Sequence, residues 1–226
     1  MATNHLRSLL TRDLYVLMVD TCVPFDKNEP LDYGQAIQRI FYESDEAKEG
    51  LGPAAYPVLK ALGDLALDDV PNLLEYLPDP QDPDFPLQAL GLQLLLDQAP
   101  RYVLTGVESR YTYAHLGEIS VRYLKQLQQL PPALHPAAWE RWKGSVSVDY
   151  YVLTRLWWGA PIVHSEKLGD EALAFTNATR EFVEHEFDVR DPYRDQPDKR
   201  WDLYGFPRML EEGGPKSPCS VADGWF

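Results

Sequence analysis

The feature that most constrains the fold is the apolar stretch Leu87–Gln98, which reads Leu-Gln-Ala-Leu-Gly-Leu-Gln-Leu-Leu-Leu-Asp-Gln. It is about twelve residues long and poor in β-branched side chains, and both properties favour a helix over a strand. A helix that is apolar on every side has to be buried. Pro100 follows, and a proline disfavours the helical conformation of the residue that precedes it. The sequence therefore predicts a central buried helix that ends near Pro100.

Helical periodicity dominates the rest of the chain. The segment Val146–Leu153 has the local propensity of a strand, but no second segment is available to pair with it, so we expect a helix from Val148. Strands do not alternate with helices and there is no glycine-rich phosphate loop, which argues against a nucleotide-binding α/β fold. The sequence thus predicts an all-α protein with further helices over Asn4–Val19, after Asp32, twice between Ala54 and Tyr76, and over Glu108–Gln129 and Glu166–Phe187.

The length of the chain, 226 residues, fits a single domain. Prolines are too dense in Pro78–Pro86 for a helix or a strand, so this stretch should be an extended connector. This connector could separate an N-terminal subdomain from the rest of the chain. Neither of the two flanking parts is expected to fold alone, so we expect one domain over residues 1–226. The tail from Asp191 should be irregular apart from a helical turn around Phe206–Leu210.

The charge of the chain narrows the partners that it can have. A formal net charge of −14 argues against binding to nucleic acid and to anionic membranes, since both attract Lys and Arg. Cys22 and Cys219 form no disulfide framework and no zinc-type spacing. The apolar run Leu14–Val19 lies between two aspartates and is too short for a signal sequence or a membrane span. We therefore expect an acidic cytoplasmic protein.

The first candidate site is Asp97 with Arg101, at the end of the apolar helix. A carboxylate at this position needs a partner, because an unpaired buried charge is costly. Arg101 is a natural partner for Asp97. Such a pair can be purely structural and fix the end of a packed helix, or it can anchor a ligand. The sequence leaves both interpretations open.

The second candidate site is the short turn Pro161–Glu166, which contains His164. Ser165 suits the N-cap of the next helix, and Glu166 suits its first turn, where the helix dipole favours negative charge. His164 could transfer a proton, because the pKa of histidine lies near neutrality, or it could be a structural histidine with satisfied hydrogen bonds.

The third candidate site is made of aromatic and arginine side chains on neighbouring helices. Aromatic faces with a few polar groups line many ligand pockets, although aromatic residues at helical spacing are also common in cores. We expect Tyr113 to face inward with Leu116 and Ile119. No hydrolase or metal-binding motif is present, so no metal or cofactor is expected. The residues of this third site are Arg110, Tyr111, Tyr113, Tyr150, Tyr151, Arg155, Trp157 and Trp158.

Two of these motifs together resemble a known family. The sequence Leu-Leu-Leu-Asp-Gln-Ala-Pro-Arg over 94–101 is followed, about sixty residues later, by Ala-Pro-Ile-Val-His-Ser-Glu over 160–166. This pairing is similar to the uncharacterised helical family known as domain of unknown function 924, and the chain resembles a fungal-type member between Leu87 and Arg194. The resemblance implies an all-α antiparallel array similar to tetratricopeptide-like hairpins, and it implies no established reaction.

The chain departs from the family pattern in two places. Ala99 stands where the family usually has Phe, and Tyr102 stands where Asn is usual, so the surroundings of Arg101 should differ. Similar proteins continue beyond a tryptophan such as Trp225 into a basic helical segment, whereas this sequence stops at Phe226. The resemblance therefore implies a member that lacks the family's C-terminal segment.

Two functional hypotheses follow, and the missing segment suggests a third, a degenerate member of the family that has lost its ancestral activity. In the first, the chain binds a small organic molecule, either as a binding protein or as a metal-independent enzyme that tailors fungal secondary metabolites. In such an enzyme, His164 would transfer a proton, and Arg101, paired with Asp97, would hold an anionic or carbonyl oxygen. In the second, the chain is a tetratricopeptide-like scaffold that binds a protein partner and has no catalytic activity. The ligand-binding residues expected under the first hypothesis are Arg110, Tyr113, Tyr151, Arg155, Trp157 and Glu166.

Overall fold

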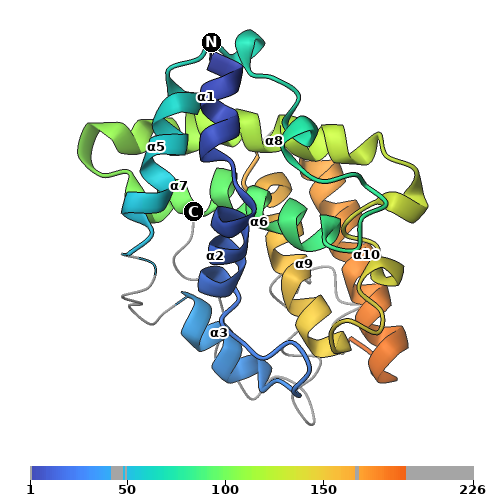
Figure 1. Ribbon diagram of the computed structural model, residues 1–226. Coiled ribbons are helices and arrows are strands. Elements are labelled where there is room, and N and C mark those ends of the chain that lie inside the picture. Colours follow the sequence, from blue (N-terminus) through green and yellow to red (C-terminus); the bar gives the residue numbers. More distant parts are fainter. Residues whose placement is uncertain (1, 42–47, 49, 166–167, 192–226) are drawn as a thin grey trace. The chain divides into compact units, whose positions relative to one another are not determined.

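The computed structural model describes residues 2–41, 48, 50–165 and 168–191 (Figure 1). All regular structure in these residues is helical, and the one β-bridge, between Lys143 and Val146, is isolated. The expectation of an all-α protein is confirmed. The tetratricopeptide-like arrangement of the helices remains a prediction. The Cα positions group into two compact units, residues 1–27 with 44–146 and residues 28–43 with 147–226.

The first unit contains most of the helices. Its α-helices are α1 (Ala2–Leu9), α2 (Arg12–Cys22), α5 (Gly52–Gly63), α6 (Phe85–Asp97), α7 (Ala99–Val103) and α8 (Gly117–Gln128). A π-helical turn, η4 (Thr112–Leu116), leads directly into α8. Short 3₁₀ turns connect these elements: η1 (Leu67–Asp69), η2 (Leu73–Tyr76), η3 (Gly106–Ser109), η5 (Pro132–Leu134) and η6 (Trp139–Arg141).

Helix α6 is the core of the first unit, as the apolar sequence predicts. Nearly all of its residues are buried. It lies against α2 and α8, and the phenol of Tyr123 in α8 donates a hydrogen bond of 3.0 Å to the carbonyl of Ala89. Gly91 allows a close approach to α2, because a Cβ atom there would lie 2.7 Å from the Cα of Tyr15. Glycine is therefore the residue that lets these two backbones meet.

Three local predictions differ from the structure of the first unit. The expected helix over Asn4–Val19 is two helices, because Thr11 caps α2 by accepting a hydrogen bond from the backbone of Leu14. The second helix expected before Tyr76 is replaced by the 3₁₀ turns η1 and η2. The proline-rich stretch 78–86 is not an extended connector, because turns occupy 80–84 and α6 begins at Phe85. The stretch lies wholly within the first unit, where the Arg141 guanidinium donates to the carbonyls of Pro80 and Asp82.

The second unit is built on α9 (Val148–Val163), with α10 (Gly169–Phe187) and α3 (Tyr33–Phe41). The helix expected from Val148 is confirmed, and Ser147 caps it by accepting from the backbone of Tyr150. Every residue from Tyr150 to Ile162 is buried. The sequence stretch expected to form a helix from Glu166 forms α10 from Gly169. Residues 192–226, including the turn expected around Phe206–Leu210, lie outside the described residues.

The second unit also joins segments that are distant in sequence. The phenol of Tyr33 in α3 donates a hydrogen bond of 2.6 Å to the carboxylate of Asp149 in α9. The Tyr33 ring meets the Phe187 ring edge to face, with 6.4 Å between centroids.

Within the described residues, no helix combines the length and the apolar character that crossing a membrane requires.

Candidate functional site

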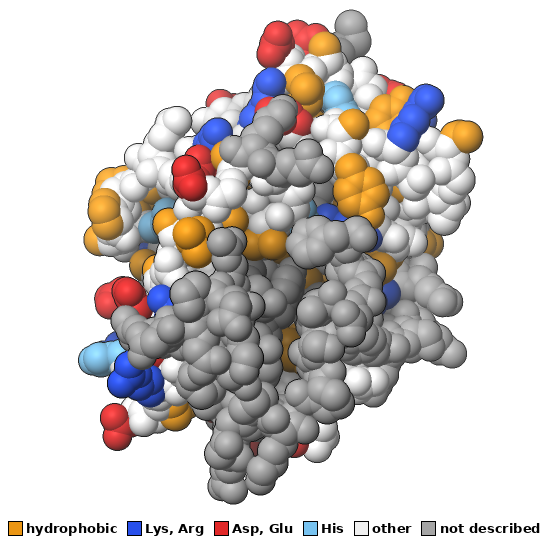
Figure 2. Space-filling view, turned by 180° about the vertical axis from the view of Figure 1, so that it is seen from behind, with side chains coloured by type: hydrophobic (Ala, Val, Ile, Leu, Met, Phe, Trp, Pro, Cys, Tyr) orange, Lys and Arg blue, Asp and Glu red, His pale blue; other side chains and the backbone are white. Residues whose placement is uncertain are grey.

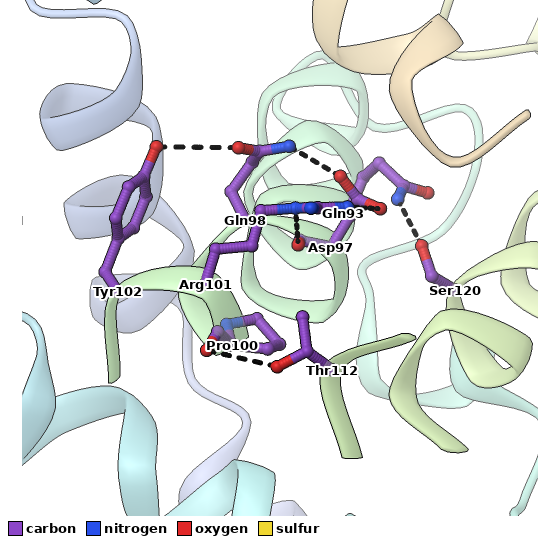
Figure 3. A network of polar contacts seen from close by, with 8 residues as sticks. All are labelled: Gln93, Asp97, Gln98, Pro100, Arg101, Tyr102, Thr112 and Ser120. Atoms are coloured by element: carbon purple, nitrogen blue, oxygen red, sulfur yellow. Dashed lines mark hydrogen bonds and ion pairs between the residues drawn. The ribbon is translucent and has the colours of Figure 1, made fainter. Parts of the chain in front are cut away.

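A polar network surrounds the junction between α6 and α7 in the first unit (Figure 3). Asp97 is the last residue of α6, and its side chain is only 5% exposed. The Gln98 amide donates to one carboxylate oxygen of Asp97 at 2.5 Å, and the Arg101 guanidinium lies 3.7 Å from the other. Arg101 Nε also donates to the backbone carbonyl of Asp97 at 3.1 Å. The pairing of Asp97 with Arg101 that the sequence suggests is therefore present.

The local sequence explains this geometry. Gln98 interrupts the helix, and Pro100 lies in the first turn of α7, where its missing N–H costs nothing. Asp97 and Arg101 are four residues apart, the spacing at which side chains meet on a helical surface. Thr112 donates a hydrogen bond of 3.4 Å to the carbonyl of Pro100 and so ties the π-helical turn to this junction.

The outer side of the network is aromatic and partly exposed. The Arg101 side chain is 21% exposed, and its guanidinium carbon lies 5.1 Å from the centroid of the Tyr113 ring. Tyr113 is 72% exposed, so the expectation that it faces inward is wrong. Arg110 stacks in the same way on Tyr111, at 5.2 Å. The result is an Arg101 guanidinium held between a buried carboxylate and an exposed ring.

The π-helical turn accounts for the orientation of Tyr113. A π-turn contains one more residue than an α-turn and therefore changes which residues face the core. Here Thr112 and Leu116 are buried, while Tyr113 faces outward. Beyond the turn the expected inward positions are buried, including Ile119, whose neighbour Ser120 accepts a hydrogen bond from Gln93. Turns of this kind are frequent at functional sites.

The remaining expected site residues lie in the second unit. Tyr151, Arg155 and Trp157 are buried in α9. Arg155 donates from Nε to the hydroxyl of Thr179 at 2.8 Å and from Nη1 to the phenol of Tyr151 at 3.2 Å. His164 follows the end of α9 and is exposed, and its backbone N–H donates to Ala160. Glu166 lies outside the described residues.

The structure thus describes two groups of expected site residues rather than one. Asp97, Arg101, Arg110 and Tyr113 belong to the first unit, while Tyr151, Arg155, Trp157 and His164 belong to the second. The described residues contain no set of three or more His, Cys, Asp or Glu side chains that could hold a metal ion.

Several residues of these groups were not predicted from the sequence. Gln98 lies between Asp97 and Arg101 in the first candidate site. It could have been predicted as a hydrogen-bond donor, because a side-chain amide next to a buried carboxylate is a natural donor. Lys48 is 8% exposed, and its ammonium lies 5.7 Å from the centroid of the Tyr102 ring. Thr179 accepts from Arg155 while it donates to the carbonyl of Phe175. Nothing in the sequence marks Lys48 or Thr179, because their partners are distant in the chain.

Comparison of the chain with protein-family models, with curated proteins and with solved structures found no match.

Proposed function

We propose that this chain is a small-organic-molecule-binding helical protein and that the exposed side of the Arg101 network is its binding surface. The observation that supports the proposal most is the environment of Arg101. Asp97 and Tyr113 hold its guanidinium from two sides, while the side chain remains 21% exposed. A guanidinium that is fixed before binding loses little entropy when it takes up a ligand oxygen.

The surroundings of Arg101 suit a flat organic ligand with a carbonyl or anionic oxygen. The Tyr113 and Tyr111 rings provide partly exposed aromatic surface beside Arg101 and Arg110. Aromatic surfaces with a few fixed polar groups are typical of small-molecule sites. The buried carboxylate of Asp97 would keep the Arg101 guanidinium oriented without contacting the ligand itself.

The enzymatic form of the proposal is metal-independent tailoring in fungal secondary metabolism, in the cytoplasm. It rests on the resemblance to domain of unknown function 924, not on geometry. In that form the Arg101 guanidinium stabilises developing charge on a ligand oxygen. His164, the proton-transfer residue expected from the sequence, belongs to the second unit and is no part of this proposal.

Substitution of Tyr113 tests the binding surface directly. Because Tyr113 is 72% exposed, Tyr113→Ala should leave folding intact and weaken retention of aromatic carbonyl compounds by about fivefold, since stacking on one ring is worth roughly 1 kcal/mol. Native mass spectrometry against a defined set of such compounds measures retention. Leu173→Ala, at a site that is 55% exposed on α10, is the matched control. Equal retention by both variants would contradict the proposal.

One observation favours the alternative, a scaffold for a protein partner. Val107, Tyr111 and Tyr113 are all exposed within one short segment, and Val107 is 81% exposed. Tyrosine and arginine are enriched in protein interfaces. Figure 2 shows hydrophobic side chains next to charged ones on the coloured part of one face. A small molecule is preferred as the ligand because Asp97 and the Tyr113 ring already orient the Arg101 guanidinium.

A further inference from the structure

The second unit contains a buried arginine whose described partners are all uncharged. Arg155 is 9% exposed. It contacts the hydroxyl of Thr179, the phenol of Tyr151 and the ring of Phe175, whose centroid lies 4.5 Å from the guanidinium carbon. No Asp or Glu of the described residues pairs with Arg155. This is unexpected in a chain with a net charge of −14, where carboxylates are plentiful.

The uncharged partners do not compensate the charge of Arg155. A buried cation without a counter-ion is costly, and its removal from water is offset only by a well-placed anion. The hydroxyl of Thr179 already donates to the carbonyl of Phe175, so it offers Arg155 a lone pair and no charge. Of the three guanidinium nitrogens, only Nε and Nη1 have acceptors among the described residues. Nη2 therefore remains available for an acceptor that is not part of this group.

A second donor lies one helical turn away. Trp158 follows Arg155 by three residues, so both lie on the same stripe of α9. Trp158 is 1% exposed, and its indole N–H has no acceptor among the described residues. Buried indole N–H groups normally have a hydrogen-bond partner. Arg155 Nη2 and the Trp158 indole N–H are therefore two donors on one face of α9 that have no acceptor among the described residues. Such a pair indicates a ligand that carries an oxygen acceptor.

We propose that Arg155 binds the carboxylate of a small organic acid with an apolar or aromatic body. A single buried cation balances one negative charge, which favours a monoanionic carboxylate over a phosphate dianion. The planar carboxylate matches the fork of the guanidinium. The rings of Phe175, Tyr151 and Phe182 provide apolar surface for the body of the acid, the latter two packing edge to face at 5.0 Å between centroids. This site lies in the second unit and is independent of the Arg101 surface.

The test uses the full chain and three acids of different shape: benzoate, phenylacetate and hexanoate. Their amides, benzamide, phenylacetamide and hexanamide, are neutral controls of nearly equal size. We expect at least one acid to raise the melting temperature by about 5 to 10 °C at roughly a hundredfold excess over its Kd, while its amide has no effect. Inorganic phosphate is the competing anion and should give no shift. A shift with phosphate alone, or with no acid at all, would overturn the proposal.

Variants of Arg155 assign the effect to this side chain. Arg155→Met removes the charge and keeps much of the stem, so the acid-dependent shift should disappear, and Arg155→Lys should weaken binding by about tenfold because the planar fork is lost. Arg12→Met, which removes an exposed arginine, is the matched control. Tyr113→Ala weakens any binding of the acid at the Arg101 surface, so a shift that Tyr113→Ala retains and Arg155→Met loses belongs to Arg155 and separates the two proposals.

The melting temperature of ligand-free Arg155→Met provides a second measurement. If Arg155 is an unfilled anion site, the loss of a poorly compensated buried charge leaves the melting temperature at or above that of the native protein. If Arg155 is a structural cation, the variant melts well below both the native protein and Arg12→Met. The latter result, or an acid-dependent shift that is lost in Tyr113→Ala and survives in Arg155→Met, would refute the anion site.

Discussion

Asp97 is the residue on which the polar network of the first unit depends, since both Gln98 and Arg101 point to it. Asp97→Ala removes the acceptor for both, so we expect the free energy of unfolding to fall by about 1 to 3 kcal/mol, less than for a fully buried pair because Arg101 is partly exposed. Asp97→Asn should lower the free energy of unfolding by less than Asp97→Ala does. Urea unfolding followed by circular dichroism measures the change.

Asp84 provides the control for this prediction. It pairs with Arg12 at 3.0 Å, but both side chains are more than half exposed. Exposed ion pairs contribute about 0 to 1 kcal/mol, so Asp84→Ala should have a small effect. Equal losses in Asp84→Ala and Asp97→Ala would show that burial of the Asp97 carboxylate does not matter.

At the scale of single residues the sequence predicts chemistry better than orientation. The spacing of Asp97 and Arg101 was sufficient to predict that they pair. Tyr113 was assigned to the core because it fits an uninterrupted α-helical period, and a single π-turn at Thr112–Leu116 is enough to expose it. A one-residue change in helical phase has no signature in the hydrophobic pattern, because tertiary contacts such as that between Thr112 and Pro100 stabilise it.

The contact between α2 and α6 is the element-scale feature that a single substitution tests best. Gly91→Ala places a Cβ atom 2.7 Å from the Cα of Tyr15, so one backbone has to move. We expect the free energy of unfolding to decrease by about 1 to 3 kcal/mol, even though alanine favours helices over glycine by about 1 kcal/mol. Thermal and urea unfolding measure the loss.

Gly63→Ala is the matched control at the end of α5, where no atom lies within 4 Å of the added Cβ. Its effect should be neutral or stabilising by up to about 1 kcal/mol. A stabilising effect of Gly91→Ala as well would mean that α2 can move away from α6 without cost.

Among the elements, those that are buried on all sides were predicted most reliably. The sequences of α6 and α9 are apolar over more than two turns, and this pattern alone is enough to predict two buried helices. The break between α1 and α2 was missed because a hydrophobic stripe continues across it, and only the side chain of Thr11 marks the new start. The same holds for η1 and η2, because the nearby Asp68, Asp69 and Pro71 are compatible with the start of either an α-helix or a 3₁₀ turn.

On the scale of the whole molecule, long-range partners are what the sequence does not reveal. Tyr33 and Asp149 are separated by 116 residues, and Arg155 and Thr179 by 24. No local sequence pattern in its own helix marks any of these residues as a partner of a distant one. Their pairing depends on how the helices pack, so the buried Arg155 group could be recognised only in the structure.

Buried tyrosines should determine how the stability of the protein responds to alkaline pH. Burial raises the pKa of Tyr123 well above its ordinary value, and burial and then the hydrogen bond to Asp149 raise the pKa of Tyr33. The folded state therefore keeps these protons where the unfolded chain loses them. The stabilisation is complete below the unfolded pKa of about 10, and it decreases above that pH by up to about 1.4 kcal/mol per pH unit for each such tyrosine.

Variants at two tyrosines isolate this effect from the titration of lysines. Tyr33→Phe removes one buried phenol, so the decrease in the free energy of unfolding between about pH 10 and pH 11 should be shallower than in the native protein by about 1 kcal/mol. Tyr113→Phe removes an exposed phenol and should leave the slope unchanged. Urea unfolding at successive pH values measures both slopes. Identical slopes in the two variants would mean that the Tyr33 phenol ionises without unfolding the second unit, and that its hydrogen bond to Asp149 contributes little to stability.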